Sequence, residues 1–276
     1  MILSTSSINL RDSHVMAIVN VTPDSFYSGS RTLQHEDIVR RVESVIKDGA
    51  TIIDIGGYSS RPNAKEVTVE QEWERVRIGL EAVRSVEAGA VVSIDSFRSE
   101  VIRRAVEEFG DVIVNDISSG EQDEAMLGVV AKYNLPYVAM HMRGTPKTMQ
   151  SLNDYEDGVV NGVMEYFKRR VKEIMAAGVS REKIVLDPGF GFAKNLEQNY
   201  ELLRGLDAIR ALGHPLLIGV SRKSMIYKPL GITPEESLPG SLALAWEVLR
   251  AGDAILRVHD VRESAQLITL AKTYRG

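Results

Sequence analysis

The stretch VVSIDSFRSEVIRRAVEEFGDVIVND, residues 91–116, contains one complete unit of the predicted fold. The β-branched runs 91–95 and 112–115 predict two buried strands that each end in a polar residue. A helical pattern lies between them, and Gly110 follows it where a left-handed helix cap is expected. Because a helix between two strands returns the chain to the same edge of the sheet, the stretch predicts a parallel pair.

The same alternation continues along the chain in both directions. Strand-like runs are predicted at residues 15–20, 51–54, 91–95, 112–115, 137–140, 184–187, 216–219 and 254–257. The helical stripes between them include Ile38, Val42, Val45 and Ile46, and further along Leu202, Leu206, Ile209 and Leu212.

Eight such units in 276 residues predict an α/β fold, a parallel eight-stranded (β/α)₈ TIM barrel that forms a single domain over residues 1–276. The alternative is an open, doubly wound sheet. The Gly-rich first turn that is common in that fold is missing from this sequence, which favours the barrel.

Composition narrows the class of protein. The chain has no cysteine, which excludes disulfides, cysteine nucleophiles and thiolate metal sites and fits a reducing compartment. Its 33 Lys+Arg against 38 Asp+Glu give a net charge of -5, which argues against a nucleic-acid partner. No run approaches the roughly 20 apolar residues of a spanning helix, and the first ten residues lack the features of a signal peptide. We therefore expect a soluble, cytoplasmic protein with no membrane association.

In a parallel barrel, the loops after the carboxyl ends of the strands form the active face. The polar residues that end or follow the predicted strands would surround this mouth: Asn20, Asp54, Asp95, Asn115, His141, Asp187, Ser221, Arg222, Lys223, Arg257 and His259. The loops 22–31, 56–65 and 142–155 have irregular compositions, and we expect them to cover it.

Two segments near the C-terminus indicate an anion site. GVSRKS, residues 219–224, brings a hydroxyl and two cations to the loop after the seventh strand, and RVHD, residues 257–260, adds two donors after the eighth. A lone Arg-Lys pair is usually a solvated face. Barrels frequently hold phosphate after strands seven and eight, so the position favours a binding role.

Other strand ends favour a planar heterocycle that carries N–H groups. Asp95 and Asn115 end neighbouring strands, and a buried carboxylate without donors would be costly. Asp187 opens DPGFGFAK, residues 187–194, whose Gly-x-Gly lacks the third glycine of a dinucleotide fingerprint. We therefore interpret Asp187 as an acceptor after the sixth strand rather than as part of a nucleotide loop.

The remaining patterns concern metals and histidines. Asn20 either satisfies backbone groups at a strand end or serves as an uncharged oxygen ligand, which together with phosphate oxygens and waters suits Mg²⁺. The five histidines contain no H-x-x-x-H pair, which argues against histidine-bound zinc, and no Ser-His-Asp signature occurs. His35 and His214 are expected on the surface. For His141, core support and ligand contact are equally favoured.

Taken together, the motifs closely resemble those of the dihydropteroate synthase family. The matching segments, one per βα step, are NVTPDSF (20–26), DIGGYSSRP (54–62), NDIS (115–118), MHMRGTPKTMQ (140–150), DPGFGF (187–192), GVSRKS (219–224) and RVHDV (257–261). The resemblance implies a folate-pathway transferase that joins p-aminobenzoate to hydroxymethyl-dihydropterin diphosphate, forming dihydropteroate and releasing diphosphate. It also implies a homodimer and a Mg²⁺ cofactor.

The resemblance further implies roles for individual residues. The pterin positions are Asp95, Asn115, Met140, Asp187 and Lys223. The p-aminobenzoate positions are Ser60, Arg61, Phe192 and Ser221. The diphosphate positions are Asn20, Arg61, Arg257 and His259, with Asn20 also on the metal, and the implied catalytic residues are Arg61, Lys223, Arg257 and His259. The departures from the family pattern are Ala17 for Gly, Tyr58 for Glu, Ser60 for Thr and Ala193 for Gly.

Two other functions remain open at this point. A pterin-binding methyltransferase domain would share Asp95, Asn115 and Asp187 but would have no reason to keep the diphosphate motifs. A noncatalytic pterin-binding paralogue would be expected to lose some of Asn20, Lys223, Arg257 and His259, and all four are present. Both observations favour the synthase.

Overall fold

Eight parallel strands form one sheet within the residues that this computed structural model describes, namely 8–22, 31–58, 66–145 and 148–276. The strands are β1 (His14–Asn20), β2 (Ile52–Gly56), β3 (Val92–Asp95), β4 (Ile113–Asp116), β5 (Tyr137–Met140), β6 (Ile184–Asp187), β7 (Leu217–Ile218) and β8 (Ile255–Val258). Their order is β6-β5-β4-β3-β2-β1-β8-β7, and the bridge Leu186↔Leu216 joins the two ends. The predicted barrel is confirmed, and the open sheet is excluded.

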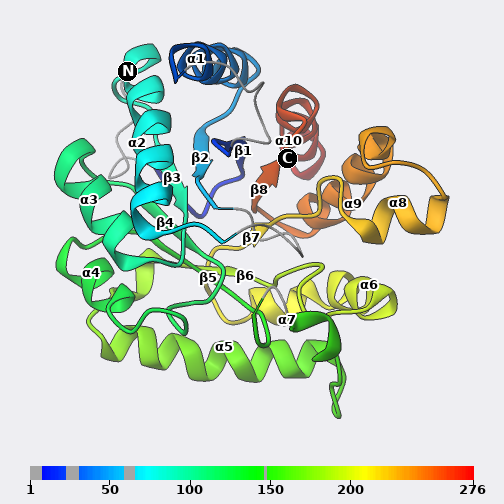
Figure 1. Cartoon of the computed structure of the whole chain (residues 1–276). Coiled ribbons are helices and arrows are strands. Elements are labelled where there is room, and N and C mark those ends of the chain that lie inside the picture. The colour runs from blue at the N-terminus through cyan, green and yellow to red at the C-terminus, as the bar shows by residue number, and fades with distance from the viewer. Residues whose placement is uncertain (1–7, 23–30, 59–65, 146–147) are drawn as a thin grey trace.

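Helices surround the strands in chain order, as Figure 1 shows in a view with the strands at the centre. They are α1 (Arg31–Lys47), α2 (Val69–Val86), α3 (Ser99–Phe109), α4 (Met126–Lys132), α5 (Val159–Ala176), α6 (Leu196–Arg204), α7 (Leu206–Arg210), α8 (Ser224–Leu230), α9 (Leu238–Ala251) and α10 (Val261–Arg275). In the described part of the chain, no helix has the length and apolar character needed to cross a membrane.

The unit at residues 91–116 shows why these residues form these elements. Helix α3 buries Val101, Ile102 and Ala105 and carries its charged residues on the outer face, so its apolar stripe holds it against the sheet. It ends at Gly110, whose φ of 85° lies in the left-handed region that glycine adopts without steric cost. The next strand then pairs so that the polar residues Asp95 and Asn115 are direct neighbours.

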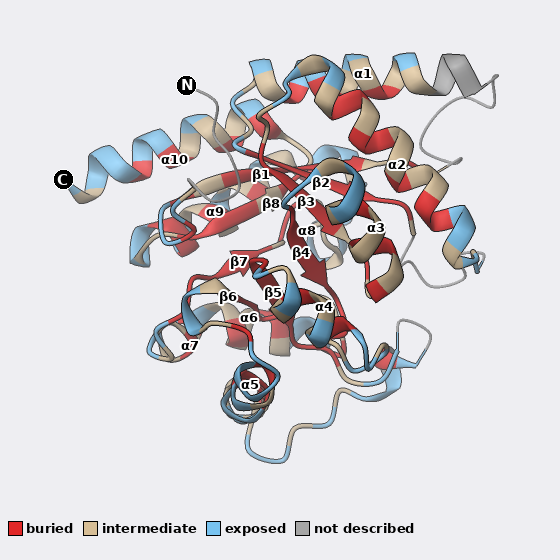
Figure 2. Ribbon diagram, turned by 90° about the vertical axis from the view of Figure 1, so that its left-hand side faces the viewer, coloured by how far each residue is buried: buried red, intermediate tan, exposed pale blue. Residues whose placement is uncertain are grey.

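The lower half of the barrel interior is an apolar layer, which we call the base layer. Seven strands contribute one residue each, Val91 comes directly before β3, and Leu10 completes the cluster: Leu10, Met16, Ile52, Val91, Ile113, Val138, Val185, Leu217 and Ile255. Figure 2 shows the strands as the buried centre of the molecule. Because side chains alternate along a strand, residues two and four positions after the base layer also point inward. The inward face therefore continues toward the mouth with the polar strand ends.

Two details differ from the sequence-based expectation. The expected single stripe is divided: Leu202 lies in α6, Leu206 and Ile209 lie in α7, Gly205 stands between the two helices, and Leu212 follows the end of α7. A Cβ at Gly205 would lie 2.5 Å from the Val160 side chain, so the close approach of α5 requires glycine there. His214, expected on the surface, is buried with its Nδ1 3.2 Å from the carbonyl oxygen of Ile184. Most of the expected covers at 22–31 and 56–65 lies outside the described residues.

Candidate functional site

A cavity of ≈ 70 Å³ lies at the carboxyl ends of the strands. It is lined by Ile18, Asp95, Asn115, Ile117, Met140, Asp187, Phe192, Gly219, Ser221, Lys223, Arg257 and His259. The inward faces of β1, β3, β4, β5, β6 and β8 and the loops after β4, β6, β7 and β8 supply these residues. The structure therefore brings most of the residues predicted for the pterin, the arylamine and the anion into one place.

Arg257 on β8 is the central cation of this cavity. Its Nε donates to Asp54 Oδ2 at 2.7 Å, and its Nη2 donates to Asp95 Oδ2 at 2.7 Å. Burial opposes the positive charge, but the two carboxylates outweigh it and raise the pKa of Arg257 above its already high usual value. Arg257 is therefore a permanent cation, and its orientation is fixed from two sides.

Asp54 lies at the mouth, as the sequence predicts, but the sequence alone predicts no role for it. The structure buries it completely, and both of its oxygens lie 3.3 Å from Asn115 Nδ2 while Oδ2 also accepts from Arg257. Asp54 thus connects a predicted pterin residue to a predicted anion residue. The signal in the sequence was its position two residues after Ile52 of the base layer, on the same inward face.

The carboxyl group of Asp95 has a less favourable environment. Burial raises its pKa to about 7, although the neighbouring Arg257 acts in the opposite direction. Asp54 adds a second negative charge nearby and raises the pKa of Asp95 further. A ligand that donates N–H groups to Asp95 would relieve this desolvation, because hydrogen bonds to the ionised form favour it.

Asp187 and Lys223 provide an acceptor and a donor to the same cavity. Asp187 Oδ1 accepts from the Gly189 N–H at 2.8 Å, and burial raises the pKa of this carboxyl while Lys223 lowers it. Lys223 donates to the Phe190 carbonyl, and its Nζ lies 4.9 Å from the centre of the Phe192 ring. Burial lowers the pKa of Lys223 to about 8, against the effect of Asp187. The pair suits a ring edge that both donates and accepts hydrogen bonds.

Ser221 and His259 connect the loops after β7 and β8. Ser221 Oγ lies 3.1 Å from His259 Nδ1 and accepts from the His259 backbone N–H at 3.2 Å. Burial, followed by the positive charges of Arg222 and Arg257, lowers the pKa of His259 to about 4. The imidazole is therefore neutral at pH 7 in the free protein and carries one N–H.

The loop after β6 is fastened by a residue that sequence reasoning missed. Lys194 is buried, and its Nζ lies 3.0 Å from the Gly189 carbonyl oxygen, 2.9 Å from that of Phe192 and 2.9 Å from His141 Nδ1. His141 does not line this cavity; it is buried, and it borders a separate cavity with Met142, Arg143 and Tyr166. Ala193, where the family pattern has Gly, adopts a left-handed φ of 50° within this loop.

The three residues implied for the diphosphate and arylamine outside this cavity have different outcomes. Asn20 ends β1 beside Gly56, where a Cβ would lie 3.2 Å from Asn20 Oδ1. The glycine thus leaves space around the amide oxygen. Ser60 and Arg61 lie outside the described residues. Among the residues that are described, no group of three or more His, Asp or Glu side chains could hold a metal.

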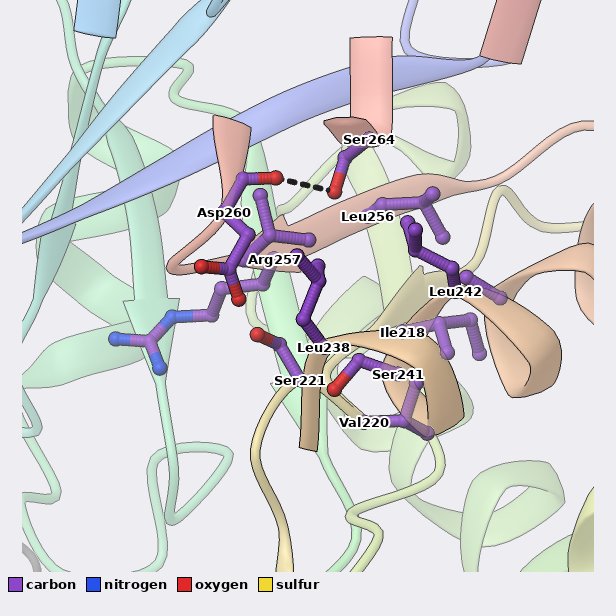
Figure 3. Close-up of a pocket in the computed structure, with 12 residues that line it drawn as sticks. Ile218, Val220, Ser221, Leu238, Ser241, Leu242, Leu256, Arg257, Asp260 and Ser264 are labelled. Atoms are coloured by element: carbon purple, nitrogen blue, oxygen red, sulfur yellow. Dashed lines mark hydrogen bonds between the residues drawn. The ribbon is translucent and has the colours of Figure 1, made fainter. Parts of the chain in front are cut away.

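Two further cavities border the site. A groove of ≈ 730 Å³ extends outward between the loop after β6 and helix α8, and Phe192 and Lys223 line both this groove and the inner cavity. Figure 3 shows a separate void of ≈ 10 Å³ between β7, β8 and α9, from which the Arg257 guanidinium points away. That void has room for about one water molecule, so it is a packing gap rather than a ligand site.

Comparisons with known proteins agree with this geometry. A family model described as pterin binding enzyme matches residues 16–259. The chain is 43% identical to the dihydropteroate synthase of Escherichia coli strain K12 over 267 residues, which cover 97% of this chain and 93% of that protein.

Solved structures give the same result. The dihydropteroate synthase of Yersinia pestis, in a sulfonamide drug complex, superposes with a TM-score of 0.89 at 36% identity, covering 97% of this chain and 96% of that one. The dihydropteroate synthase of Xanthomonas albilineans with 4-aminobenzoic acid has a TM-score of 0.89 at 34% identity, covering 99% and 98%.

Proposed function

The chain belongs to the pterin-binding enzymes and, among them, to the dihydropteroate synthase family, and from this membership we propose how its residues share the reaction. The activity is the transfer of the pterin-methyl group to p-aminobenzoate in folate biosynthesis. The full-length match to synthases favours this activity over the methyltransferase and the noncatalytic paralogue.

The pterin occupies the inner cavity in this proposal. The observation that supports this placement is the set of polar side chains that line the cavity. Asp187 and Asp95 can accept N–H groups, and Asn115 and Lys223 can donate to ring acceptors. Burial disfavours both carboxylates, so a ligand that donates to them gains more than it would from solvated groups. Met140 forms part of the apolar wall against the ring.

The diphosphate lies toward Arg257 and His259. Two of the five N–H donors of Arg257 bind carboxylates within the described residues, which leaves donors to face an anion. His259 adds one N–H, and an anion beside it would favour its protonated form. These groups stabilise the charge that develops when the C–O bond to diphosphate breaks and its electron pair leaves with diphosphate.

The arylamine attacks from the junction between the two cavities. Its nitrogen forms the new C–N bond to the methylene carbon and then loses a proton, so no protein nucleophile is needed. Phe192 and Lys223 line both the inner cavity and the outer groove, which places them between a bound pterin and the outside. Ser221, with Ser60 and Arg61 as predicted partners, completes the proposed p-aminobenzoate site. By analogy with the Yersinia protein, a sulfonamide would compete there.

The described residues could supply only a small part of the ligand set of a magnesium ion. Asn20 supplies one uncharged oxygen that Gly56 leaves accessible, and the described residues offer no carboxylate cluster, so the diphosphate and waters would provide most ligands. When bound, Mg²⁺ would supply positive charge to the leaving group. Calorimetry of diphosphate with and without Mg²⁺ tests this, and Asn20→Ala should remove the difference. A difference that survives in Asn20→Ala would show that Asn20 does not hold the metal.

We further propose a single-domain homodimer that works in the cytoplasm. The described elements from β1 to α10 all belong to one barrel, and the absence of cysteine fits a reducing compartment. Leu270 and Tyr274 of α10 are 62% and 67% exposed, an apolar surface that a second copy could cover. Light scattering should give twice the 30.5 kDa chain mass, and Tyr274→Glu should lower it. A monomer at micromolar concentration would contradict the dimer.

The decisive test of the function is p-aminobenzoate-dependent release of diphosphate from the pterin substrate. The folded protein should release diphosphate only when both substrates are present. Release that is independent of p-aminobenzoate, or none at all, would contradict the proposal.

A further inference from the structure

We propose that Arg222 and Asp260 are positioning residues for anion binding. Their ion pair fastens the loop after β7 to the loop after β8, which holds the anion-facing side chains in one arrangement. The inference rests on the anion-binding role proposed for His259, which Ser221 contacts.

The pair has the geometry of a specific contact. Arg222 Nη2 donates to Asp260 Oδ1 at 2.5 Å and Nε donates to Asp260 Oδ2 at 3.0 Å, so two parallel hydrogen bonds fix the planar groups against each other. The side chains are only 30% and 14% exposed. Bidentate pairs of this kind add geometric specificity as well as energy.

The backbone at Arg222 indicates why the pair is needed. Its φ of 57° lies in the left-handed region, which residues with a Cβ seldom adopt unless their surroundings hold them there. The Arg222 N–H donates to Ser241 Oγ at 3.0 Å, and the Ser241 hydroxyl in turn donates to the Ser237 carbonyl at 2.9 Å. Helix α9 therefore supports the turn from behind.

The left-handed turn at Arg222 gives the three consecutive side chains of residues 221–223 different surroundings. Ser221 and Lys223 line the inner cavity, whereas Arg222 between them borders the outer groove and its guanidinium reaches Asp260. The left-handed residue thus directs its two neighbours to the cavity, while its own side chain fixes the turn to the next loop.

Asp260 is held from the opposite side. Its carbonyl oxygen accepts from the Ser264 hydroxyl at 2.7 Å, the contact drawn in Figure 3, and from the Ser264 N–H at 3.2 Å. His259, the residue before it, is held through its own carbonyl by Arg41 at 3.1 Å. Helices α1 and α10 therefore fix the position of the loop after β8. The ion pair between Asp260 and Arg222 in turn fixes the loop after β7 relative to it.

The two loops are joined by two adjacent contacts, Ser221 with His259 and Arg222 with Asp260. Losing the second contact leaves the first as the remaining side-chain link between them among the described residues. We expect the His259 imidazole to sample more orientations and the anion to bind more weakly, whereas Lys223 keeps its contact with the Phe190 carbonyl. The pterin, held by β3, β4 and β6, should be affected little.

The experiment compares Asp260→Asn, Arg222→Gln and the double variant. Calorimetry measures inorganic diphosphate with Mg²⁺ and, separately, unphosphorylated hydroxymethylpterin. Each single variant should bind diphosphate about 3- to 10-fold more weakly, comparable to the loss of one ordinary hydrogen bond, and pterin within about twofold of the parent. The double variant should be no weaker than the worse single variant, because both act through one contact.

A matched control comes from the start of the same helix. Arg262 forms an ion pair with Asp48, whose Oδ1 accepts from Nε at 2.9 Å and from Nη2 at 2.7 Å, and neither residue lines the cavity. Asp48→Asn should leave both affinities unchanged. An equal loss in Asp48→Asn, an unchanged diphosphate affinity in Asp260→Asn, or losses that multiply in the double variant would each overturn the proposal, the last because Arg222 would then contact the ligand itself.

His259→Ala separates this inference from the proposed function. If His259→Ala does not weaken diphosphate, the anion role of His259 is wrong and the inference falls with it. If His259→Ala weakens diphosphate but Asp260→Asn does not, only the positioning role is wrong. Thermal unfolding of each variant confirms that the protein measured is folded.

Discussion

The base layer and the mouth of the barrel are built on the same strands and differ only in height. Ile52, Ile113 and Ile255 belong to the base layer, and two residues further along their strands stand Asp54, Asn115 and Arg257. Both sets point inward, because the pleat repeats every two residues. The lower set fills space with apolar atoms, and the upper set satisfies buried polar atoms by pairing them across the barrel.

The difference shows how one fold can separate stability from binding. An apolar layer has no hydrogen-bonding demands, so its contribution depends on volume and packing. A polar layer at similar depth is tolerated only when every charge has a partner, and a ligand can be one of those partners. Substitutions in the base layer should therefore lower stability, whereas substitutions at the mouth should lower ligand affinity.

The largest effect is expected in the base layer. Ile113→Ala removes buried volume from a closed interior and should lower the free energy of unfolding by about 2–5 kcal/mol. Affinities for both substrates should stay within about twofold in the folded protein. Urea denaturation gives the first quantity and calorimetry the second. A changed pterin affinity with unchanged stability would show that the two layers are not separable.

Asp187→Asn tests the mouth. One acceptor becomes a donor against buried N–H groups of the ligand, so pterin affinity should fall by roughly 2–4 kcal/mol while the urea midpoint changes little. Asp116→Asn is the matched control, because Asp116 is also a buried aspartate at a strand end. It accepts from Ser118, Gly120 and Tyr137 and does not line the cavity. It should lose stability and keep pterin affinity, and the reverse result would contradict the comparison.

Within the mouth, Arg257→Ala or His259→Ala should distinguish the anion from the ring. Charge-assisted contacts contribute about 1.5–3 kcal/mol, so diphosphate affinity should fall by that amount. Unphosphorylated pterin should be weakened much less. Calorimetry with the two ligands provides the test, and equal losses for both would mean that these residues are structural.

The smallest predicted effect is a dependence on pH. Burial lowers the pKa of Lys223 to about 8, so its charge is present below that pH and lost above it. Pterin affinity should therefore decrease a few-fold between pH 7.5 and 9.5. Lys223→Met is the control, since any pH dependence that it retains belongs to the ligand or to another group of the cavity such as Asp95, whose pKa burial raises to about 7. A slope identical to that of the parent protein would exclude Lys223 as its source.

Much of the fold could be predicted because its signals are local. The eight strands lie within two residues of their predicted ends, and Gly110 ends α3 as expected, since periodicity and caps depend on neighbouring residues. The break at Gly205 could not be predicted, because it depends on Val160 of a different helix. The burial of His214 likewise depends on the path of a distant strand.

The site divides in the same way. The sequence placed the polar residues at one mouth, because strand ends of a parallel barrel share a face. It did not pair Asp54 with Arg257, which are 203 positions apart, because the stagger of the barrel decides which strand ends meet. The left-handed turn at Arg222 and the buried Lys194 were missed for the same reason, since their partners come from other loops.

The bridge between β6 and β7 has a dynamic consequence. β1 pairs with β2 along its length, from Met16↔Ile52 to Asn20↔Gly56. In the described sheet, by contrast, β6 is joined to the segment of β7 by the single bridge Leu186↔Leu216, where the Leu186 N–H donates to the Pro215 carbonyl at 2.9 Å. In native-state hydrogen exchange, the Leu186 amide should therefore open more often than those of β1 and β2. A pterin bound by Asp187 of β6 and by Lys223 in the loop after β7 would link these two neighbouring parts of the barrel. Pterin binding should therefore slow hydrogen exchange at the Leu186 amide more than at the Ile53 amide. The bound ligand would then stabilise the closure of the barrel.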